Sequence, residues 1–136
     1  MLEIACFEIT SAETACQSMA DRIEFCADFE LGGTTPDFYE FMHLKRNFKT
    51  PVYVMIRPKG GPFFYSEAEF IEMKTSIITF REGGADGFVF GILTADNEID
   101  EARNKELIEL AGETPCTFHR AFDRTLDLDR SIQTLI

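Results

Sequence analysis

Two pairs of segments in this chain resemble each other at nearly the same spacing. Residues 20–25, Ala-Asp-Arg-Ile-Glu-Phe, resemble residues 85–90, Ala-Asp-Gly-Phe-Val-Phe, and Thr50-Pro51 resembles Thr114-Pro115. Each pair is offset by about 65 residues, which is the length of two strand–helix units. A regular two-unit repeat is typical of a barrel built from successive quarters, whereas an open doubly wound sheet has no reason to keep it. This repeat therefore favours a closed-barrel architecture over other α/β folds.

Short apolar runs alternate along the chain with longer segments of helical pattern. The expected strands are residues 2–7, 22–26, 52–56, 87–91 and 116–119. The expected helices are residues 10–20, a segment after Pro36, residues 66–84, residues 99–111 and a segment that begins near Asp127. Alternation of this kind predicts βαβ units with a parallel sheet and right-handed crossovers.

Several residues mark where these elements should begin and end. Thr10–Glu13 and Ser66–Glu69 both have the spacing of a capping box at a helix N-terminus. Pro36 should lie near the first turn of the second helix, and Pro51 should open the third strand. Gly83-Gly84 should end the third helix.

The chain has 136 residues, of which 45% are hydrophobic and 27% charged. This length and composition predict one globular domain over residues 1–136. A complete (β/α)8 TIM-type barrel needs eight strands and typically about 250 residues. We therefore predict an α/β fold that is the N-terminal portion of such a barrel, truncated to about five βα units. The first and fifth strands should then have unpaired edges.

The formal net charge of −11 is unfavourable for binding nucleic acid or an anionic membrane surface. No segment approaches the roughly 18 apolar residues that a membrane-spanning helix needs, and residues 1–4 do not resemble a signal peptide. The four cysteines, Cys6, Cys16, Cys26 and Cys116, are too widely spaced to suggest a disulfide framework. We expect a cytoplasmic protein.

Polar residues with possible chemistry lie in or just after the predicted strands. They are Glu3, Glu24, Cys26, Arg57, His119, Arg120 and Asp123. Active sites of (β/α) barrels lie at the carboxyl ends of the strands, so these residues could hold an anionic or polyhydroxy ligand and perform acid–base chemistry.

Structural roles are the alternative for the same residues. Arg57 could form an internal ion pair with Glu3 or Glu24, and His119 could be a core residue. The chain contains no Ser–His–Asp arrangement, zinc motif or dinucleotide-binding fingerprint.

Five segments together resemble the copper homeostasis family called CutC. They are residues 20–26, 32–36, 51–61 with Tyr65-Ser66, 84–91, and 117–123. The resemblance runs from Leu2 to near the last residue. It implies a (β/α)8 barrel and a cytoplasmic protein linked by the family name to copper tolerance.

The resemblance also implies two cysteines as copper ligands, one on each of the first two strands. The second corresponds to Cys26, but the first falls on Ala5. Cys6 is adjacent, and the alternation of side chains along a strand places it on the opposite face from Ala5. Cu(I) prefers soft thiolate ligands.

Three hypotheses follow from these observations. The chain could bind or handle copper through Cys26 with Cys6 or His119. It could be a barrel enzyme acting on a small anionic or sugar-like molecule, with Glu24 or His119 as acid or base and Arg57 and Arg120 holding the anion. It could instead have no independent activity, either as a fragment of a longer product or as a chain that pairs with a second copy, and we expect a homo-oligomer.

Overall fold

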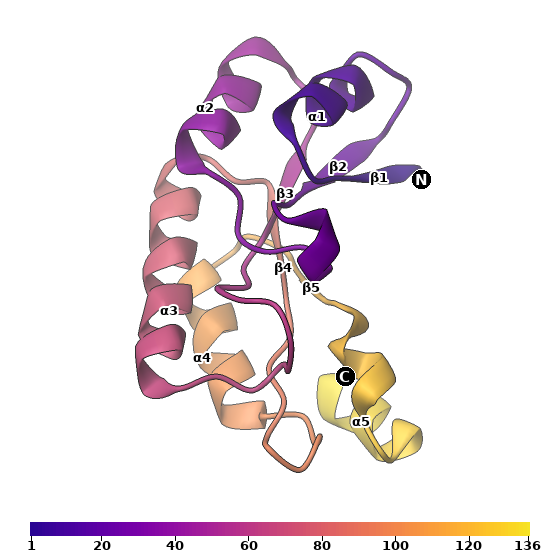
Figure 1. The fold of residues 1–136 in the computed structure, drawn as a ribbon, viewed down its shortest axis with the longest axis vertical. Coiled ribbons are helices and arrows are strands. Elements are labelled where there is room, and N and C mark those ends of the chain that lie inside the picture. Colours follow the sequence, from indigo (N-terminus) through magenta and orange to yellow (C-terminus); the bar gives the residue numbers. More distant parts are fainter.

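Five parallel β-strands lie side by side in one sheet, in the order in which they occur along the chain. The computed structural model describes residues 1–136, and Figure 1 shows the strands alternating with helices. The strands are β1 (Glu3–Cys6), β2 (Arg22–Phe25), β3 (Val52–Met55), β4 (Gly87–Phe90) and β5 (Cys116–Phe118). Sequential order with parallel pairing is the arrangement of a (β/α) barrel.

Five α-helices and two short 3-10 helices connect and follow these strands. The α-helices are α1 (Ile9–Cys16), α2 (Phe38–Asn47), α3 (Glu67–Glu82), α4 (Glu101–Ala111) and α5 (Leu128–Leu135). The 3-10 helices are η1 (Phe29–Leu31) and η2 (Arg120–Arg124). No helix is both long and apolar enough to cross a membrane.

The main core lies between one face of the sheet and helices α1 to α4. Side chains such as Phe25 and Val54 from the strands pack there with Phe41 of α2 and Ile77 of α3. The opposite face of the sheet carries a smaller cluster of Cys26, Tyr53, Met55 and Val89. Because residues alternate between the faces of a strand, this second face is the one that would line the inside of a barrel.

The sheet is open, as the sequence predicts. β1 pairs only with β2, and β5 pairs only with β4, so each has one free edge. Helix α5 lies apart from α1–α4, on the other side of β5 (Figure 1).

The capping box predicted at α3 is confirmed. The Ser66 side chain accepts a hydrogen bond from the backbone of Glu69 at 3.2 Å, and the Ser66 backbone donates to the Glu69 carboxylate at 2.8 Å. The capping box predicted at Thr10–Glu13 is wrong. Helix α1 begins earlier, at Ile9, with Glu8 as its uncapped N-terminal residue, so Thr10 lies inside the first turn.

Helix α1 also ends at Cys16 rather than near residue 20. The Ser18 hydroxyl donates to the Ala15 carbonyl and accepts from the Ala20 backbone, and these local bonds compete with helix continuation. At α2, Pro36 lies before the first turn, because Asp37 is the N-cap and accepts from the backbones of two residues in that turn.

Two further boundaries differ from the prediction near the C-terminus. Helix α4 begins at Glu101 rather than residue 99, because Asp100 caps it and Ile99 forms an isolated bridge with Leu93. β5 ends at Phe118, and the chain enters η2 immediately afterwards. The start of the last helix is confirmed, with Asp127 as its N-cap.

Candidate functional site

A cavity of about 390 Å³ lies on the barrel-facing side of the sheet, toward the carboxyl ends of the strands. Its polar lining consists of Glu24, Arg57, Thr117, His119 and Arg120, and its apolar walls include Phe7, Phe63 and Val89. β2, β3 and β5 place these polar groups, because parallel strands end at the same edge of the sheet. Four of the predicted site residues therefore surround one cavity.

Arg57 follows β3 and is only 2% exposed. Hydrogen bonds to three backbone carbonyls hold its side chain in place. Its guanidinium donates to the carbonyls of Leu31, Gly33 and Gly61 at 2.7, 2.9 and 2.9 Å. It also lies over the ring of Phe63, with its central carbon 4.7 Å from the centroid. No carboxylate pairs with it, so the alternative of an internal ion pair with Glu3 or Glu24 is wrong.

His119 is held as a neutral imidazole by its surroundings. Burial lowers its pKa to about 4, and the nearby positive charges of Arg57 and Arg120 act in the same direction. The ring Nδ1 accepts from the backbone of Ala121 at 3.2 Å, which assigns the proton of the neutral ring to Nε2. Nε2 itself is buried and has no hydrogen-bond partner. This N–H is the kind of donor that a ligand oxygen could accept from.

Glu24 lies on β2, in the wall of the same cavity. Burial raises the pKa of its carboxyl group above the usual value. The Cys26 thiol, two residues further along the strand, donates to a Glu24 carboxylate oxygen at 3.5 Å. A partly buried carboxyl with a raised pKa is suited to accept and return a proton.

Arg120 begins η2 and lies close to Arg57. A Cβ on Gly32 would be 3.4 Å from Nη2 of Arg120 and 3.6 Å from Nη1 of Arg57, so the two guanidiniums approach the same point. Neither the hydrogen bonds nor the ion pairs of the chain join them to a carboxylate.

Glu3 and Asp123 do not join this group. Glu3 is at the amino end of β1, away from the cavity, where it pairs with Arg22. The guanidinium of Arg22 in turn lies over the ring of Tyr53. Asp123 is exposed in η2, and its side chain makes no hydrogen bond or ion pair.

The two predicted metal ligands lie on opposite faces of the sheet. Cys26 belongs to the barrel-facing cluster, and Cys6 belongs to the core beneath the helices. Burial raises the pKa of the Cys6 thiol to about 11, and burial together with the Glu24 charge raises that of Cys26 further. No three His, Cys, Asp or Glu side chains gather as a metal-binding group. These donors do not fit a paired-thiolate Cu(I) site.

A second cavity, of about 410 Å³, adjoins the first and shares Arg57, Phe63 and Arg120 with it. It adds Arg124 and Asn97, which the sequence alone did not single out. The sequence does contain a signal for Arg124, because this second arginine follows Arg120 by four residues, just after the fifth predicted strand. Nothing in the sequence indicated Asn97, because its loop approaches η2 only in the folded chain.

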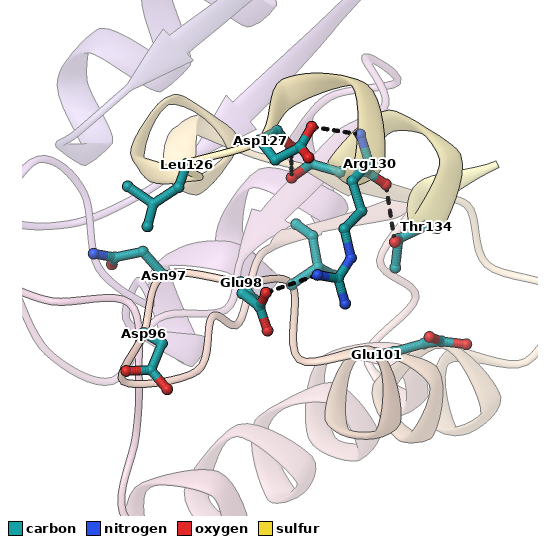
Figure 2. Close-up of a pocket in the computed structure, with 10 residues that line it drawn as sticks. Asp96, Asn97, Glu98, Glu101, Leu126, Asp127, Arg130 and Thr134 are labelled. Carbon is teal, nitrogen blue, oxygen red and sulfur yellow. Dashed lines mark hydrogen bonds and ion pairs between the residues drawn. The ribbon is translucent and has the colours of Figure 1, made fainter.

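Figure 2 shows a third, smaller cavity of about 230 Å³ between α5 and the loop before α4. Arg130 of α5 pairs with Glu98 of the loop at 2.9 Å, and Asp127 caps the helix. Its central arginine is thus already paired. This contact joins α5 to the loop that carries Asn97, so it supports the second cavity.

The comparisons with known proteins agree with this architecture. The model of the CutC family matches residues 1–136, the whole chain. The chain belongs to the CutC family. It is 41% identical over 136 residues to a human protein named copper homeostasis protein cutC homolog, covering all of this chain and 50% of that protein. It is 42% identical over 123 residues to the family protein CutC of Salmonella typhimurium, covering 90% of this chain and 50% of that protein.

A solved structure gives the same result for the fold. The crystal structure of CutC from Streptococcus agalactiae superposes with a TM-score of 0.92 at 31% sequence identity, covering 99% of this chain and 67% of that chain. CutC is a TIM-barrel family, so the predicted fold class is confirmed. The chain spans about half the length of the curated CutC relatives that it matches.

Proposed function

We propose that this CutC chain contributes the binding and acid–base groups of an enzyme site for a small anionic or sugar-like metabolite. One observation carries the proposal: Glu24, with a raised pKa, and His119, with a lowered one, line the same cavity as two arginines that have no carboxylate partner. Burial favours the uncharged form of both groups, and shifted pKa values of this kind in a cavity are typical of functional sites.

Each side chain has a distinct role in this proposal. Arg57 and Arg120 hold the negative charge of the ligand, because guanidinium groups bind oxyanions through paired N–H donors. His119 donates its Nε2 proton in a hydrogen bond to a ligand oxygen. Glu24 removes a proton from the ligand and returns it. Phe7 and Phe63 form apolar walls beside the polar groups.

The test is a thermal-shift screen of the 136-residue chain against phosphorylated compounds, carboxylates and sugars. A ligand that binds the folded state raises the melting temperature by mass action. We expect a hit for the wild type that is reduced in Glu24→Gln and His119→Asn. Lys49→Gln serves as the matched control, because Lys49 is exposed and precedes β3, at the opposite end of that strand from Arg57. A hit that both site variants retain in full would contradict the proposed roles.

A second candidate function is the handling of copper as cargo. The name of the human relative favours it, and Cys26 lies on the barrel-facing side beside the Glu24 carboxylate. One protonated thiol is a weak basis for Cu(I) binding. Titrating the reduced protein with Cu(I) against a competing chelator tests this function. Copper handling through Cys26 requires weaker binding in Cys26→Ser than in Cys6→Ser, and equal affinity in wild type and Cys26→Ser would exclude it.

We also propose a cytoplasmic location. All four cysteines are free thiols in the structure, which is the usual state in a reducing compartment.

A further inference from the structure

The second cavity, bounded by Arg57, Arg120 and Arg124, has an unusual charge composition. Its eight lining residues include these three arginines and Asn97, and none is an aspartate or glutamate. We call it the arginine cavity. Three positive side chains around one cavity, one buried and two exposed, repel one another and favour the binding of an anion.

The lack of acidic residues in the arginine cavity contrasts with the rest of the chain. The chain has 24 acidic residues and 13 lysines and arginines, so carboxylates are abundant. Ion pairs elsewhere engage the positive side chains of Arg22, Lys45, Lys59, Lys74, Arg103 and Arg130. The three arginines of the arginine cavity pair with none of the 24 acids. Arg46, Lys49, Arg81 and Lys105 are also without an ion pair, but none of them lines one of the cavities described above. The missing negative charge therefore fits a ligand better than a protein group.

One wall of the arginine cavity is held in place by the fold and is not formed by surface side chains alone. Arg57 is buried, and three loop carbonyls use three of its five N–H bonds. The buried Nε–H is among those left without a partner. Gly32 lies against the guanidiniums of Arg57 and Arg120 with a φ of +79°, a conformation that disfavours any side chain in this narrow space.

We propose that the arginine cavity binds the phosphate group of a phosphorylated metabolite, with Arg57, Arg120 and Arg124 as its ligands. Three guanidiniums match a dianionic phosphate, with its three terminal oxygens, better than a singly charged carboxylate. The adjoining cavity with Glu24 and His119 receives the remainder of the same molecule. That second part rests on the proposed function, whereas phosphate binding itself does not.

Arg124 is the residue that best tests this inference. It is exposed, so its replacement should not disturb folding, and it lines the arginine cavity but not the cavity that contains Glu24. Arg46 on α2 is a matched control, because it is also exposed and unpaired but lies on a helix that covers the other face of the sheet.

The experiment is a calorimetric titration of the 136-residue chain with inorganic phosphate at constant ionic strength, repeated with acetate. We expect phosphate to bind the wild type and Arg46→Gln equally. Arg124→Gln should bind at least about tenfold more weakly, the loss expected for one charge-assisted hydrogen bond. Arg124→Lys, which keeps the charge but not the fork of donors, should be intermediate. Absence of phosphate binding, equal binding by Arg124→Gln, or equally tight binding of acetate would overturn the inference.

Glu24→Gln separates this inference from the proposed function. Phosphate should bind this variant as it binds the wild type, because Glu24 does not line the arginine cavity. A metabolite that needs Glu24 and His119 but not Arg124 would leave the proposed function intact and overturn the phosphate site. Phosphate binding that depends on Arg124, without any metabolite that depends on Glu24, would do the reverse.

Discussion

His119 shows how a single side chain at the end of a strand is given one protonation state. The backbone of Ala121 donates to Nδ1, Gly91 leaves room for the ring, and burial beside two arginines disfavours the imidazolium. The result is a neutral ring with its proton on Nε2. The effect of this lowered pKa on the free energy of unfolding can be measured without a ligand.

We predict that His119 makes the folded chain less stable as the pH falls from about 6.5 to about 4. The unfolded chain protonates His119 near its ordinary pKa of 6.5, while the folded chain does so only at about 4. Between these values the unfolded state binds more protons, so the free energy of unfolding decreases as the pH falls, by at most about 3 kcal/mol.

Urea unfolding of wild type and His119→Asn at pH 7 and pH 4.5 measures this effect. Asparagine does not titrate, but its side-chain oxygen can accept from the Ala121 backbone in place of Nδ1. Other titrating groups are common to both proteins and cancel in the comparison. The wild type should lose more stability than the variant between the two pH values, and an equal loss would contradict a lowered His119 pKa.

For single residues, the sequence predicted where the site side chains lie better than it predicted which atoms they bond to. The strand-end rule predicted that Glu24, Arg57, His119 and Arg120 lie near one another, and side-chain alternation placed Cys6 opposite Cys26. The partners of Arg57 were not predictable, because they are carbonyls of two loops whose conformations depend on the whole fold.

At the scale of single elements, the two capping-box sequences give a direct comparison. Ser66 caps α3 through both reciprocal bonds, whereas Thr10 lies within α1 and makes no capping bond. Ser66→Ala should therefore lower the free energy of unfolding by about 1 kcal/mol, and Thr10→Ala should change it by less than about 0.5 kcal/mol. Chemical denaturation of both variants measures this. Equal losses would mean that the assigned start of α1 is wrong.

Strand β4 and the residue that follows it contain two positions, Gly87 and Gly91, where a neighbouring ring occupies the space of a side chain. A Cβ on Gly87 would lie 2.3 Å from the Tyr53 ring, and one on Gly91 would lie 2.8 Å from Nδ1 of His119. Alanine at either position should destabilise the fold by roughly 1–3 kcal/mol through overpacking. Only Gly91→Ala should also weaken ligand binding, because it displaces His119. Denaturation and thermal-shift assays test both effects, and unchanged ligand shifts in Gly91→Ala would contradict the placement of His119.

The order and type of the elements were predictable, but several ends were not. Apolar periodicity identified all five strands and all five α-helices. The start of α1 was misplaced because Thr10 and Glu13 have the spacing of a cap without its geometry. η2 was missed because a 3-10 segment directly after a strand has no periodic apolar pattern, although it carries both Arg120 and Arg124.

At the scale of the whole molecule, the sheet is covered on one face only. Helices α1–α4 bury that face, while Glu3 and Ala5 at the start of the other face are exposed. In a closed TIM barrel this second face lies inside and both outer strands are paired. The chain alone therefore leaves two strand edges and part of the barrel-facing surface in contact with solvent.

We predict that the 136-residue chain associates with itself in solution. The free edges of β1 and β5 offer unpaired backbone groups, and α5 exposes Leu128 by 52%, Ile132 by 44% and Leu135 by 41%. Unpaired edges and apolar surface both favour association. Size-exclusion chromatography with light scattering, over a range of protein concentrations, should show a mass above that of one chain.

Charged substitutions on α5 indicate which surface is responsible. Ile132→Glu should shift the distribution toward monomer, because a charge on the apolar face of α5 opposes its burial between chains. Ile71→Glu is the matched control, since Ile71 is 57% exposed on α3, away from both free edges. Association that survives Ile132→Glu unchanged would assign it to the strand edges instead. A monomer that melts cooperatively at every concentration would contradict the prediction, and would show that the helix-covered face alone stabilises this half of a CutC barrel.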